Sequence, residues 1–237
     1  VRPVLEFCSG DLSALYFDIR KDALYCDRPD SIRRRAARTV MDEVFARLTA
    51  WLSPLTPFTM EEAWTTRFPD AGTNCARVIP ETPAEWNNPA EAERWASVKE
   101  VLDCVNEAME DARSAKRIGG ALDAHVRVIY CRRQPPFGDD ADLLAAFEGL
   151  DAAEVFRSST AELETALYPL SDDVITMGQA SWAGGKLDMR IDVQRSEHPK
   201  CARSWRRVPD VGSDPAYPDL SARDADAVRF WDQTHGT

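Results

Sequence analysis

Residues 11–27 read DLSALYFDIRKDALYCD, and apolar residues in and before this segment recur at steps of three and four. Such spacing places them on one face of an α-helix. That face would hold Leu5, Cys8, Leu12, Leu15 and Ile19. Pro29 cannot continue a helix, because its ring fixes φ and its nitrogen carries no hydrogen. The segment therefore predicts an amphipathic helix that ends before Pro29.

A second helix is predicted to begin just after Pro29, where Asp30 or Ser31 can cap its N-terminus. The helix should end before Pro54. Its apolar stripe comprises Ala37, Met41, Val44, Leu48 and Trp51. Spacing on the outer face predicts two ion pairs, Arg38 with Asp42 and Glu43 with Arg47.

A short helix and a connection follow. Thr59 and Glu62 have the spacing of a capping box, which predicts a helix that runs through Trp64 and is stopped by Pro69. Residues 69–88 are rich in proline, threonine and asparagine, and we interpret them as a linker.

A long helix is predicted next, with Asn88 as its N-cap and Pro89 in its first turn. Gly119 or Gly120 should end it, because glycine readily adopts the left-handed conformation found at helix C-termini. Its apolar face would hold Trp95, Val98, Leu102, Val105, Met109 and Ala112.

The pattern changes after residue 119. Val126, Val128 and Tyr130 alternate as a strand does, up to the pair Pro135-Pro136. A second alternating set is Leu187, Met189, Ile191 and Val193. Between these strands, residues 143–150 favour a helix and residues 154–157 a short strand.

The sequence thus predicts an α+β protein with three domains. An antiparallel helical bundle should occupy residues 1–118, a small mixed α/β domain residues 119–195, and a short tail residues 196–237. We see no internal repeat.

The composition is that of a globular protein, with 44% apolar residues in a chain of 237. No apolar run is long enough to span a membrane, and the opening residues lack the basic and apolar regions of a signal peptide. The six cysteines are scattered without paired spacings, which argues against a disulfide framework. We expect a cytosolic protein, and the start at Val1 suggests a cut or processed chain.

The net charge of −11 is unevenly distributed. Residues 139–173 contain ten acids and one base, Arg157, and so carry −9 of it. Residues 20–51 net +3, and residues 198–207 hold four bases and no acid. Because salt screens charges beyond roughly 8 Å, the local field governs phosphate binding, and a polyanionic partner remains compatible with this chain.

Residues 200–228 read KCARSWRRVPDVGSDPAYPDLSARDADAV and keep the spacing of a zinc ribbon. The four positions that would be cysteines in a ribbon are Cys201, Ser204, Ser221 and Asp224. A neutral hydroxyl is a poor zinc ligand, so the sequence argues against zinc. Hydrophobic contacts are expected to replace the metal, with candidates Trp205, Val208, Val211, Tyr217, Leu220 and Val228.

No catalytic motif occurs, whether a Walker loop, G-x-G-x-x-G, G-x-S-x-G or H-E-x-x-H, and no catalytic residue is predicted. The binding candidates are basic. They are Arg33, Arg34, Arg35 and Arg38 near a helix start, Lys116 and Arg117 at a helix end, and Lys200, Arg203, Arg206 and Arg207 around Trp205.

Each basic set has a purely structural alternative. The arginines of residues 33–38 could only solubilise a helix, and the expected pair with Asp42 supports that alternative. Lys116 and Arg117 could simply complement the helix dipole. Trp205 could be the core residue of a tiny domain, since tryptophan commonly anchors small folds.

Three stretches together resemble bacterial isoleucyl-tRNA synthetases, which are class I enzymes. Residues 11–27, the arginine-rich helix and WLSPLTPFTMEEAW at 51–64 resemble their anticodon-binding helical domain. AKRIGGALDAHV at 115–126 is similar to the junction after the long helix of that domain. Residues 200–228 resemble their C-terminal zinc-binding ribbon, so the resemblance covers essentially the whole chain.

The resemblance implies a ligase that joins isoleucine to its tRNA using ATP and magnesium. The HIGH and KMSKS signatures are absent, so the catalytic and editing domains, and the first helix of the bundle, are expected upstream of Val1. This chain, with no cofactor of its own, would bind the anticodon stem and loop of isoleucine tRNA. Neither a membrane nor DNA is an expected partner.

Two alternatives stay open. The chain could be a free-standing RNA-binding or protein-interaction module derived from a synthetase C-terminus. It could also be a helical scaffold that contacts a protein partner through acidic residues 139–173.

Overall fold

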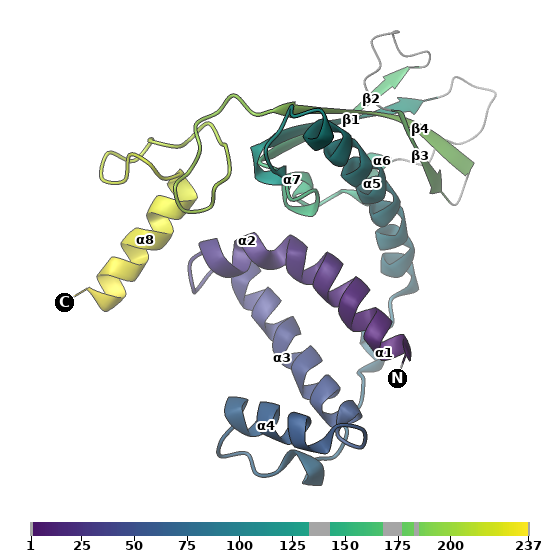
Figure 1. Ribbon diagram of the computed structural model, residues 1–237, viewed down its shortest axis with the longest axis vertical. Helices are drawn as coiled ribbons and strands as arrows, with labels where there is room; N and C mark the ends of the chain where they lie inside the picture. The colour runs from purple at the N-terminus through teal and green to yellow at the C-terminus, as the bar shows by residue number, and fades with distance from the viewer. Residues whose placement is uncertain (1, 133–142, 168–176, 183–184, 237) are drawn as a thin grey trace. The chain divides into compact units, whose positions relative to one another are not determined.

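The computed structural model describes residues 2–132, 143–167, 177–182 and 185–236, and Figure 1 shows their secondary structure. The chain forms two compact units. Unit 1 comprises Val1–Arg28 with Pro89–Thr237, and unit 2 comprises Pro29–Asn88. The division at residues 118 and 195 into three domains stays a prediction.

The helix predicted around residues 11–27 is present in unit 1. It consists of α1 (Arg2–Glu6), a π-helical segment (Phe7–Phe17) and α2 (Asp18–Cys26), which follow one another without interruption. Leu12 and Ile19 are buried, whereas Leu5 is exposed. The helix ends where Asp27 turns to an extended conformation, two residues before Pro29.

Among the described residues, the sheet of unit 1 has four strands in the order β2-β1-β4-β3. They are β1 (Ala124–Arg132), β2 (Thr160–Leu167), β3 (Met177–Trp182) and β4 (Gly185–Arg195). β1 pairs in parallel with β2, and antiparallel pairs join β1 to β4 and β4 to β3. Both strands predicted from alternation are confirmed, and so is the α+β class. The Pro135-Pro136 pair lies outside the described residues.

α5 (Pro89–Ser114) packs against this sheet, and its predicted apolar face forms the main core. The period of the helix and the alternation of the strands bring two apolar surfaces together. Buried in that core are Val98, Leu102, Val105, Met109 and Ala112 of α5, Val126, Val128 and Tyr130 of β1, and Met189, Ile191 and Val193 of β4.

The predicted end of α5 at Gly119 or Gly120 is wrong. The helix ends at Ser114, and Lys116 adopts the left-handed conformation with φ 58°. The Arg117 N–H donates to the Ala112 carbonyl at 2.8 Å and the Lys116 N–H to the Arg113 carbonyl at 2.9 Å. These two bonds form a Schellman motif, so hydrogen bonding to the last carbonyls imposes the turn on a residue other than glycine.

The strand predicted for residues 154–157 is also wrong. Residues Ala152–Val155 form helix α7, because the Asp151 carboxylate accepts the N–H groups of Ala153 and Glu154. Arg157 follows with φ 57° and turns the chain toward β2. The helix predicted over residues 143–150 is present as the shorter α6 (Leu143–Ala146).

The tail of unit 1 consists of turns and helix α8 (Ala222–His235). Its small core contains Cys201, Leu220 and Ala225, with Val211, Tyr217 and Val228 packed against them. Trp205 is not part of this core, since 60% of the residue is exposed. The alternative that Trp205 anchors a tiny domain is therefore wrong.

Unit 2 is built on α3 (Ile32–Leu52) and α4 (Pro57–Arg67). Ser31 caps α3, as predicted, by accepting the Arg34 N–H at 3.4 Å. The capping box predicted at Thr59 is wrong, because α4 already begins at Pro57 and contains Thr59. Proline suits the first turn of a helix, where its missing N–H costs nothing.

The linker predicted for residues 69–88 is packed against α3 through polar contacts. The buried Asn74 amide donates to the Thr49 carbonyl at 3.0 Å. Arg77 donates to the Ala46 carbonyl at 3.0 Å, and its guanidinium lies 3.4 Å from the Trp64 ring centroid. These contacts were not visible in composition, because each joins residues far apart in the sequence.

One of the two ion pairs predicted on α3 is present. Arg47 pairs with Glu43 at 2.5 Å. Asp42 instead pairs with Arg67 of α4 at 3.0 Å, and the described residues give Arg38 no ion-pair partner. No described helix is both long and apolar enough to cross a bilayer.

The core of unit 1 gives a first prediction. Ile191→Ala should lower the free energy of unfolding by about 2–5 kcal/mol, because it leaves a cavity at a fully buried position between β4 and α5. Leu5→Ala, at an exposed position of the same unit, is the control and should change it by less than about 0.5 kcal/mol. Urea titration of both variants measures the difference, and equal losses would contradict the assigned core.

Candidate nucleic-acid interface

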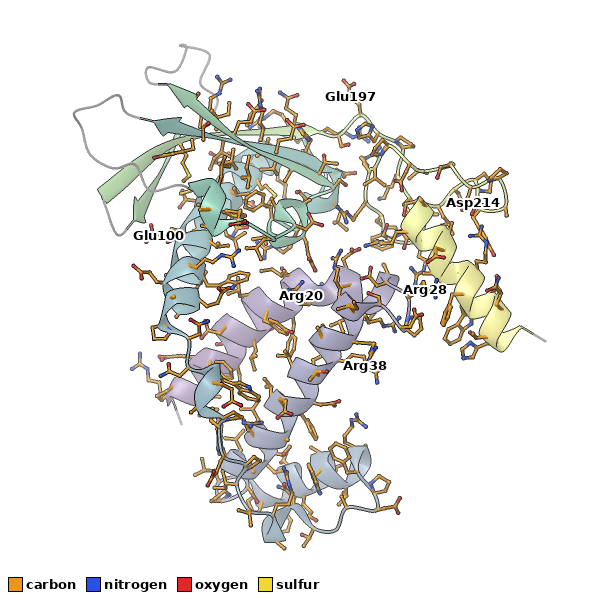
Figure 2. The ribbon with its side chains drawn as sticks, turned by 180° about the vertical axis from the view of Figure 1, so that it is seen from behind. Arg20, Arg28, Arg38, Glu100, Glu197 and Asp214 are labelled. Carbon is orange, nitrogen blue, oxygen red and sulfur yellow. The ribbon has the colours of Figure 1, made fainter. Side chains whose placement is uncertain are left out.

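The first basic set lies on the opening turns of α3. Arg33 and Arg34 are half-buried, whereas Arg35 and Arg38 are exposed. Figure 2 shows Arg38 on α3. Arg34 and Arg38 are one helical turn apart and so share a face of the helix. The Ser31 cap fixes where the helix begins, and the helical geometry sets the spacing of the arginines.

The arginines of the tail bind acceptors within unit 1. Arg203 donates to the Cys26 carbonyl at 2.5 Å, to the Tyr25 carbonyl at 2.9 Å and to Asp224 Oδ1 at 2.8 Å. It thereby caps the C-terminal carbonyls of α2. All three partners hold the guanidinium against the protein.

Arg206 and Arg207 are engaged in the same way. Arg206 donates to the Ser159 carbonyl at 2.8 Å and lies 3.7 Å from Asp22. Arg207 donates to Asp123 at 2.9 Å, and the hydrogen bond and charge of Arg207 hold the pKa of Asp123 below its usual range. These guanidiniums connect the tail to the sheet and to α2.

Lys200 and Trp205 are exposed at the surface of the tail. The Lys200 ammonium lies 5.5 Å from the Trp205 ring centroid, within range of a cation–π interaction. Trp205 has φ 63°, a conformation that bulky side chains rarely adopt. The backbone N–H of Trp205 donates to the Cys201 carbonyl at 3.0 Å, and this bond closes the turn that presents the indole.

A cavity of about 630 Å³ lies beside this indole. Its lining comes from α2, α5, the α7 region and the tail, and includes Ile19, Met109, Arg157 and Trp205. Within this lining, Arg157 pairs with Asp18 at 2.7 Å and donates a hydrogen bond to Asn106. The volume is in the range of small-molecule pockets.

The third basic set lies at the C-terminus of α5, as predicted. Lys116 is exposed at the left-handed turn, and Arg117 donates to the Val193 carbonyl at 2.9 Å. Arg117 thus links the end of α5 to β4. The hydrogen bond to Val193 and the helix dipole are sufficient reasons for basic residues at these two positions. A contact of either residue with RNA stays a prediction.

The four positions with ribbon spacing meet at Asp224, which is fully buried. Its Oδ2 accepts the Cys201 thiol at 3.1 Å and the Ser221 hydroxyl at 2.8 Å. Ser204 is buried too. Its hydroxyl makes no hydrogen bond of ordinary geometry to the described residues, yet it lies close enough to lower the pKa of Asp224.

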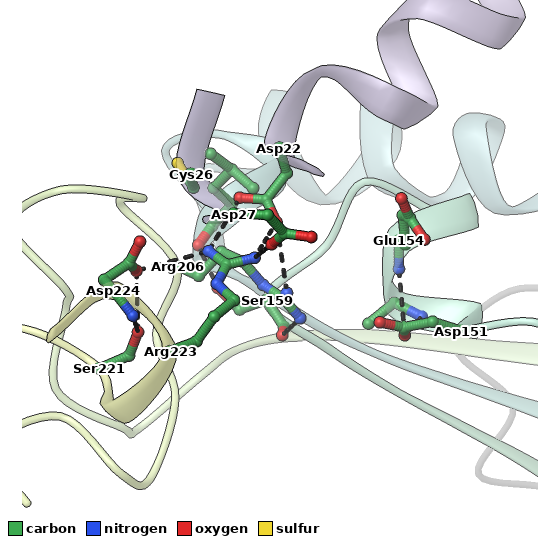
Figure 3. A network of polar contacts seen from close by, with 12 residues as sticks. Asp22, Cys26, Asp27, Asp151, Glu154, Ser159, Arg206, Ser221, Arg223 and Asp224 are labelled. Atoms are coloured by element: carbon green, nitrogen blue, oxygen red, sulfur yellow. Dashed lines mark hydrogen bonds and ion pairs between the residues drawn. The ribbon is translucent and has the colours of Figure 1, made fainter. Parts of the chain in front are cut away.

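Two arginines balance the Asp224 charge, and both reach α2. Arg203 binds Oδ1, and Arg223 lies 3.4 Å from Oδ2. Arg223 also pairs with Asp22 and lies 3.5 Å from Asp27, so that Figure 3 shows it between the two ends of this network. Burial lowers the pKa of Arg223, but the hydrogen bond and charge of Asp22 outweigh burial and raise it overall.

Sequence reasoning missed this network, although one signal for it was present. Residues 221–224 read SARD, a helix-capping pattern, and Ser221 does accept the Asp224 N–H at 3.3 Å. Nothing local indicates Asp22 or Arg223, because they are about two hundred residues apart in the chain. In the sequence, Arg223 has the pattern of a solvated residue in an acidic helix, and only the fold brings it to Asp22.

The comparisons with known proteins identify the family. A family model described as "Anticodon-binding domain of tRNA ligase" matches residues 1–128. The chain belongs to this family.

Relatives of this anticodon-binding chain extend the similarity to the tail. The isoleucine–tRNA ligase of Caulobacter vibrioides is 53% identical over 236 residues, which is 100% of this chain and 22% of that protein. The ligases of Brucella abortus and Agrobacterium fabrum are each 43% identical over 228 residues, 96% of this chain and 22% of theirs. The chain thus spans about a fifth of these relatives, and its resemblance to isoleucyl-tRNA synthetases is confirmed.

The buried carboxylate of this anticodon-binding chain gives a prediction on pH. Burial raises the pKa of Asp224, but Ser204, the charge of Arg223 and the bonds from Cys201 and Ser221 outweigh it and lower the pKa to about 2. The unfolded pKa is about 3.9. The ionised carboxylate therefore stabilises the fold fully above about pH 4, and this contribution of roughly 2–3 kcal/mol is lost as the pH falls to about 2.

Asp224→Asn removes the titrating group, so the stability difference between wild type and variant should shrink by that amount between about pH 5 and about pH 2. Urea titrations across this range measure it. A difference that stays constant with pH would show that Asp224 does not titrate as described.

Proposed function

We propose that this chain is the part of an isoleucine–tRNA ligase that binds the anticodon stem and loop of isoleucine tRNA. The match of residues 1–128 to the anticodon-binding family carries the proposal. ATP and magnesium would act in the catalytic domain of the intact cytoplasmic enzyme, outside this chain. The role of this chain is selection and positioning, with the catalytic and editing domains as its covalent partners.

Trp205 and Lys200 are the residues of the tail best placed to contact the loop. An exposed indole offers a stacking surface for an unpaired base, and the nearby ammonium offers a partner for a phosphate. The cavity beside Trp205 provides room for a base that has left the stack. Arg203, Arg206 and Arg207 act in this proposal mainly by holding the turn in place.

The arginines of α3 would contact the stem. Arg35 and Arg38 are exposed, Arg33 and Arg34 lie on the same first turns, and an arginine fork matches phosphate oxygens. The positive N-terminal end of the helix dipole favours an anion at the same place. Unit 2 carries this set, and unit 1 carries the tail.

The alternatives predict different binding. Gel shifts with isoleucine tRNA and a mismatched tRNA, each at two salt concentrations, separate them. We expect tighter binding to isoleucine tRNA than to the mismatched tRNA at both salt concentrations. Equal binding to both tRNAs would indicate a nonspecific RNA module, and no binding to either would favour a protein scaffold.

Arg34→Ala or Arg38→Ala should each reduce the slope of log K against log salt for tRNA binding by about one unit, because each removes one phosphate contact. The control is Arg67→Ala, an arginine of the same unit that is neutralised by Asp42. Filter binding over a salt series measures the slope. Slopes unchanged in both test variants would remove these residues from the interface.

Trp205→Ala should weaken binding by roughly 1–3 kcal/mol, the range for loss of one stacked base. Since the indole is mostly exposed, the melting temperature should change little. The matched control is Trp231→Ala, an exposed tryptophan of α8 that stacks on His235. Binding affinity and thermal unfolding are measured in parallel, and equal binding by both variants would contradict a role for Trp205.

A further inference from the structure

The tail keeps the arrangement of a zinc ribbon but places a carboxylate at its centre. Cys201 and Ser204 lie in the turn near the start of the tail, whereas Ser221 and Asp224 lie at the start of α8. All four are buried. The Cys201 sulfur both donates to Asp224 at 3.1 Å and accepts the Ser221 N–H at 3.3 Å. The two halves of the ribbon are thus joined by hydrogen bonds where a metal would join them.

This donor set does not fit zinc. Structural zinc sites use four thiolate or imidazole ligands, whereas here one thiol and one carboxylate meet two hydroxyls. Among the described residues, no group of three or more His, Cys, Asp and Glu side chains could hold a metal ion. Both oxygens of Asp224 already accept hydrogen bonds.

The charges around Asp224 also oppose a metal. Two guanidiniums lie within 3.4 Å of its oxygens, Arg203 at 2.8 Å and Arg223 at 3.4 Å. A divalent cation at the same carboxylate would be repelled by both at short range. The arginines neutralise the buried Asp224 carboxylate, as a zinc ion would neutralise its thiolate ligands.

We propose that the Asp224 carboxylate replaces zinc in this tail, forming a metal-independent polar cluster that fixes residues 201–206 and docks the tail on the C-terminal end of α2. The cluster comprises Cys201, Ser204, Ser221 and Asp224 with Arg203 and Arg223. This proposal stands whether or not the chain binds RNA.

The cluster holds the turn that presents Trp205. Cys201 is anchored at both ends, by its sulfur to the cluster and by its backbone, whose carbonyl accepts the Trp205 N–H and whose N–H donates to the Arg206 carbonyl at 2.9 Å. Trp205 needs such support, because a bulky residue at positive φ is strained. Asp224 and Arg203 are therefore positioning residues for the indole.

The docking on α2 follows from the buried negative charge of Asp224. Arg203 binds Asp224 and the Tyr25 and Cys26 carbonyls together, and Arg223 bridges Asp224 to Asp22. The buried charge of Asp224 requires cationic partners, and the two guanidiniums that supply them also bind α2.

The first experiment measures metal directly on the whole chain, expressed with zinc in the medium. Elemental analysis should find well under one zinc per chain, and a chelator should leave thermal unfolding and the rate of tryptic cleavage at residues 203–207 unchanged. One equivalent of zinc, with loss of tail structure on chelation, would overturn the proposal.

The second experiment tests the carboxylate. Asp224→Asn leaves two half-buried arginines without the Asp224 anion and should speed tryptic cleavage of the tail at least about tenfold, since losing the charge at this fully buried position is costly. Asp219→Asn, at an exposed carboxylate of the same tail, is the matched control and should cleave at the wild-type rate. Equal rates in the two variants would overturn the role of Asp224.

The third experiment tests whether the four positions converge, even if Asp224→Asn fails to fold. A variant with Ser204→Cys, Ser221→Cys and Asp224→Cys presents four thiols with Cys201. It should bind one equivalent of zinc or cobalt(II), and cobalt should give the visible absorption of a tetrahedral thiolate site. The wild-type chain should give no such signal, and absence of binding by the variant would contradict the convergence.

Discussion

The tail of this anticodon-binding chain depends on one buried charge and the two guanidiniums that balance it. A carboxylate that is fully removed from water is costly unless it is paired and hydrogen-bonded. Asp224 meets this condition through the Cys201 thiol, the Ser221 hydroxyl and two arginines. Because those arginines also hold α2, the local requirement of one carboxylate becomes a contact between the two ends of the sequence.

The same constraint explains how a chain with a net charge of −11 uses its bases. Arg157, Arg203, Arg206, Arg207 and Arg223 all pair with acids or carbonyls inside unit 1. A basic cluster in the sequence is therefore not the same as a basic surface. Arg35, Arg38, Lys200 and Trp205 stay exposed, and RNA is proposed to be held through them together with the half-buried Arg33 and Arg34.

Local sequence patterns predicted the helices and strands. Particular hydrogen bonds and ion pairs determined where a helix ends and how the segments pack. The stripe on α5 and the alternation in β1 and β4 predicted the main core, because burial of a periodic face leaves a direct signal in the sequence. The end of α5 was mispredicted, and the interpretation of residues 69–88 as a linker did not include their packing against α3. Lys116 and Arg77 adopt their positions through hydrogen bonds to particular carbonyls, and composition carries no sign of such bonds. For the site, ribbon spacing located the four residues of the tail but not the partners Asp22 and Arg223 that complete it.

Replacing a metal by a carboxylate changes what the tail is attached to. The buried anion of Asp224 needs cations, and here each cation is shared with α2. The indole of Trp205 is consequently fixed relative to α2, α5 and the cavity that they line. A preorganised stacking surface loses less conformational entropy on binding than a mobile one, so the ion pairs that stabilise the tail would also favour the stacking of an unpaired base that is proposed for Trp205.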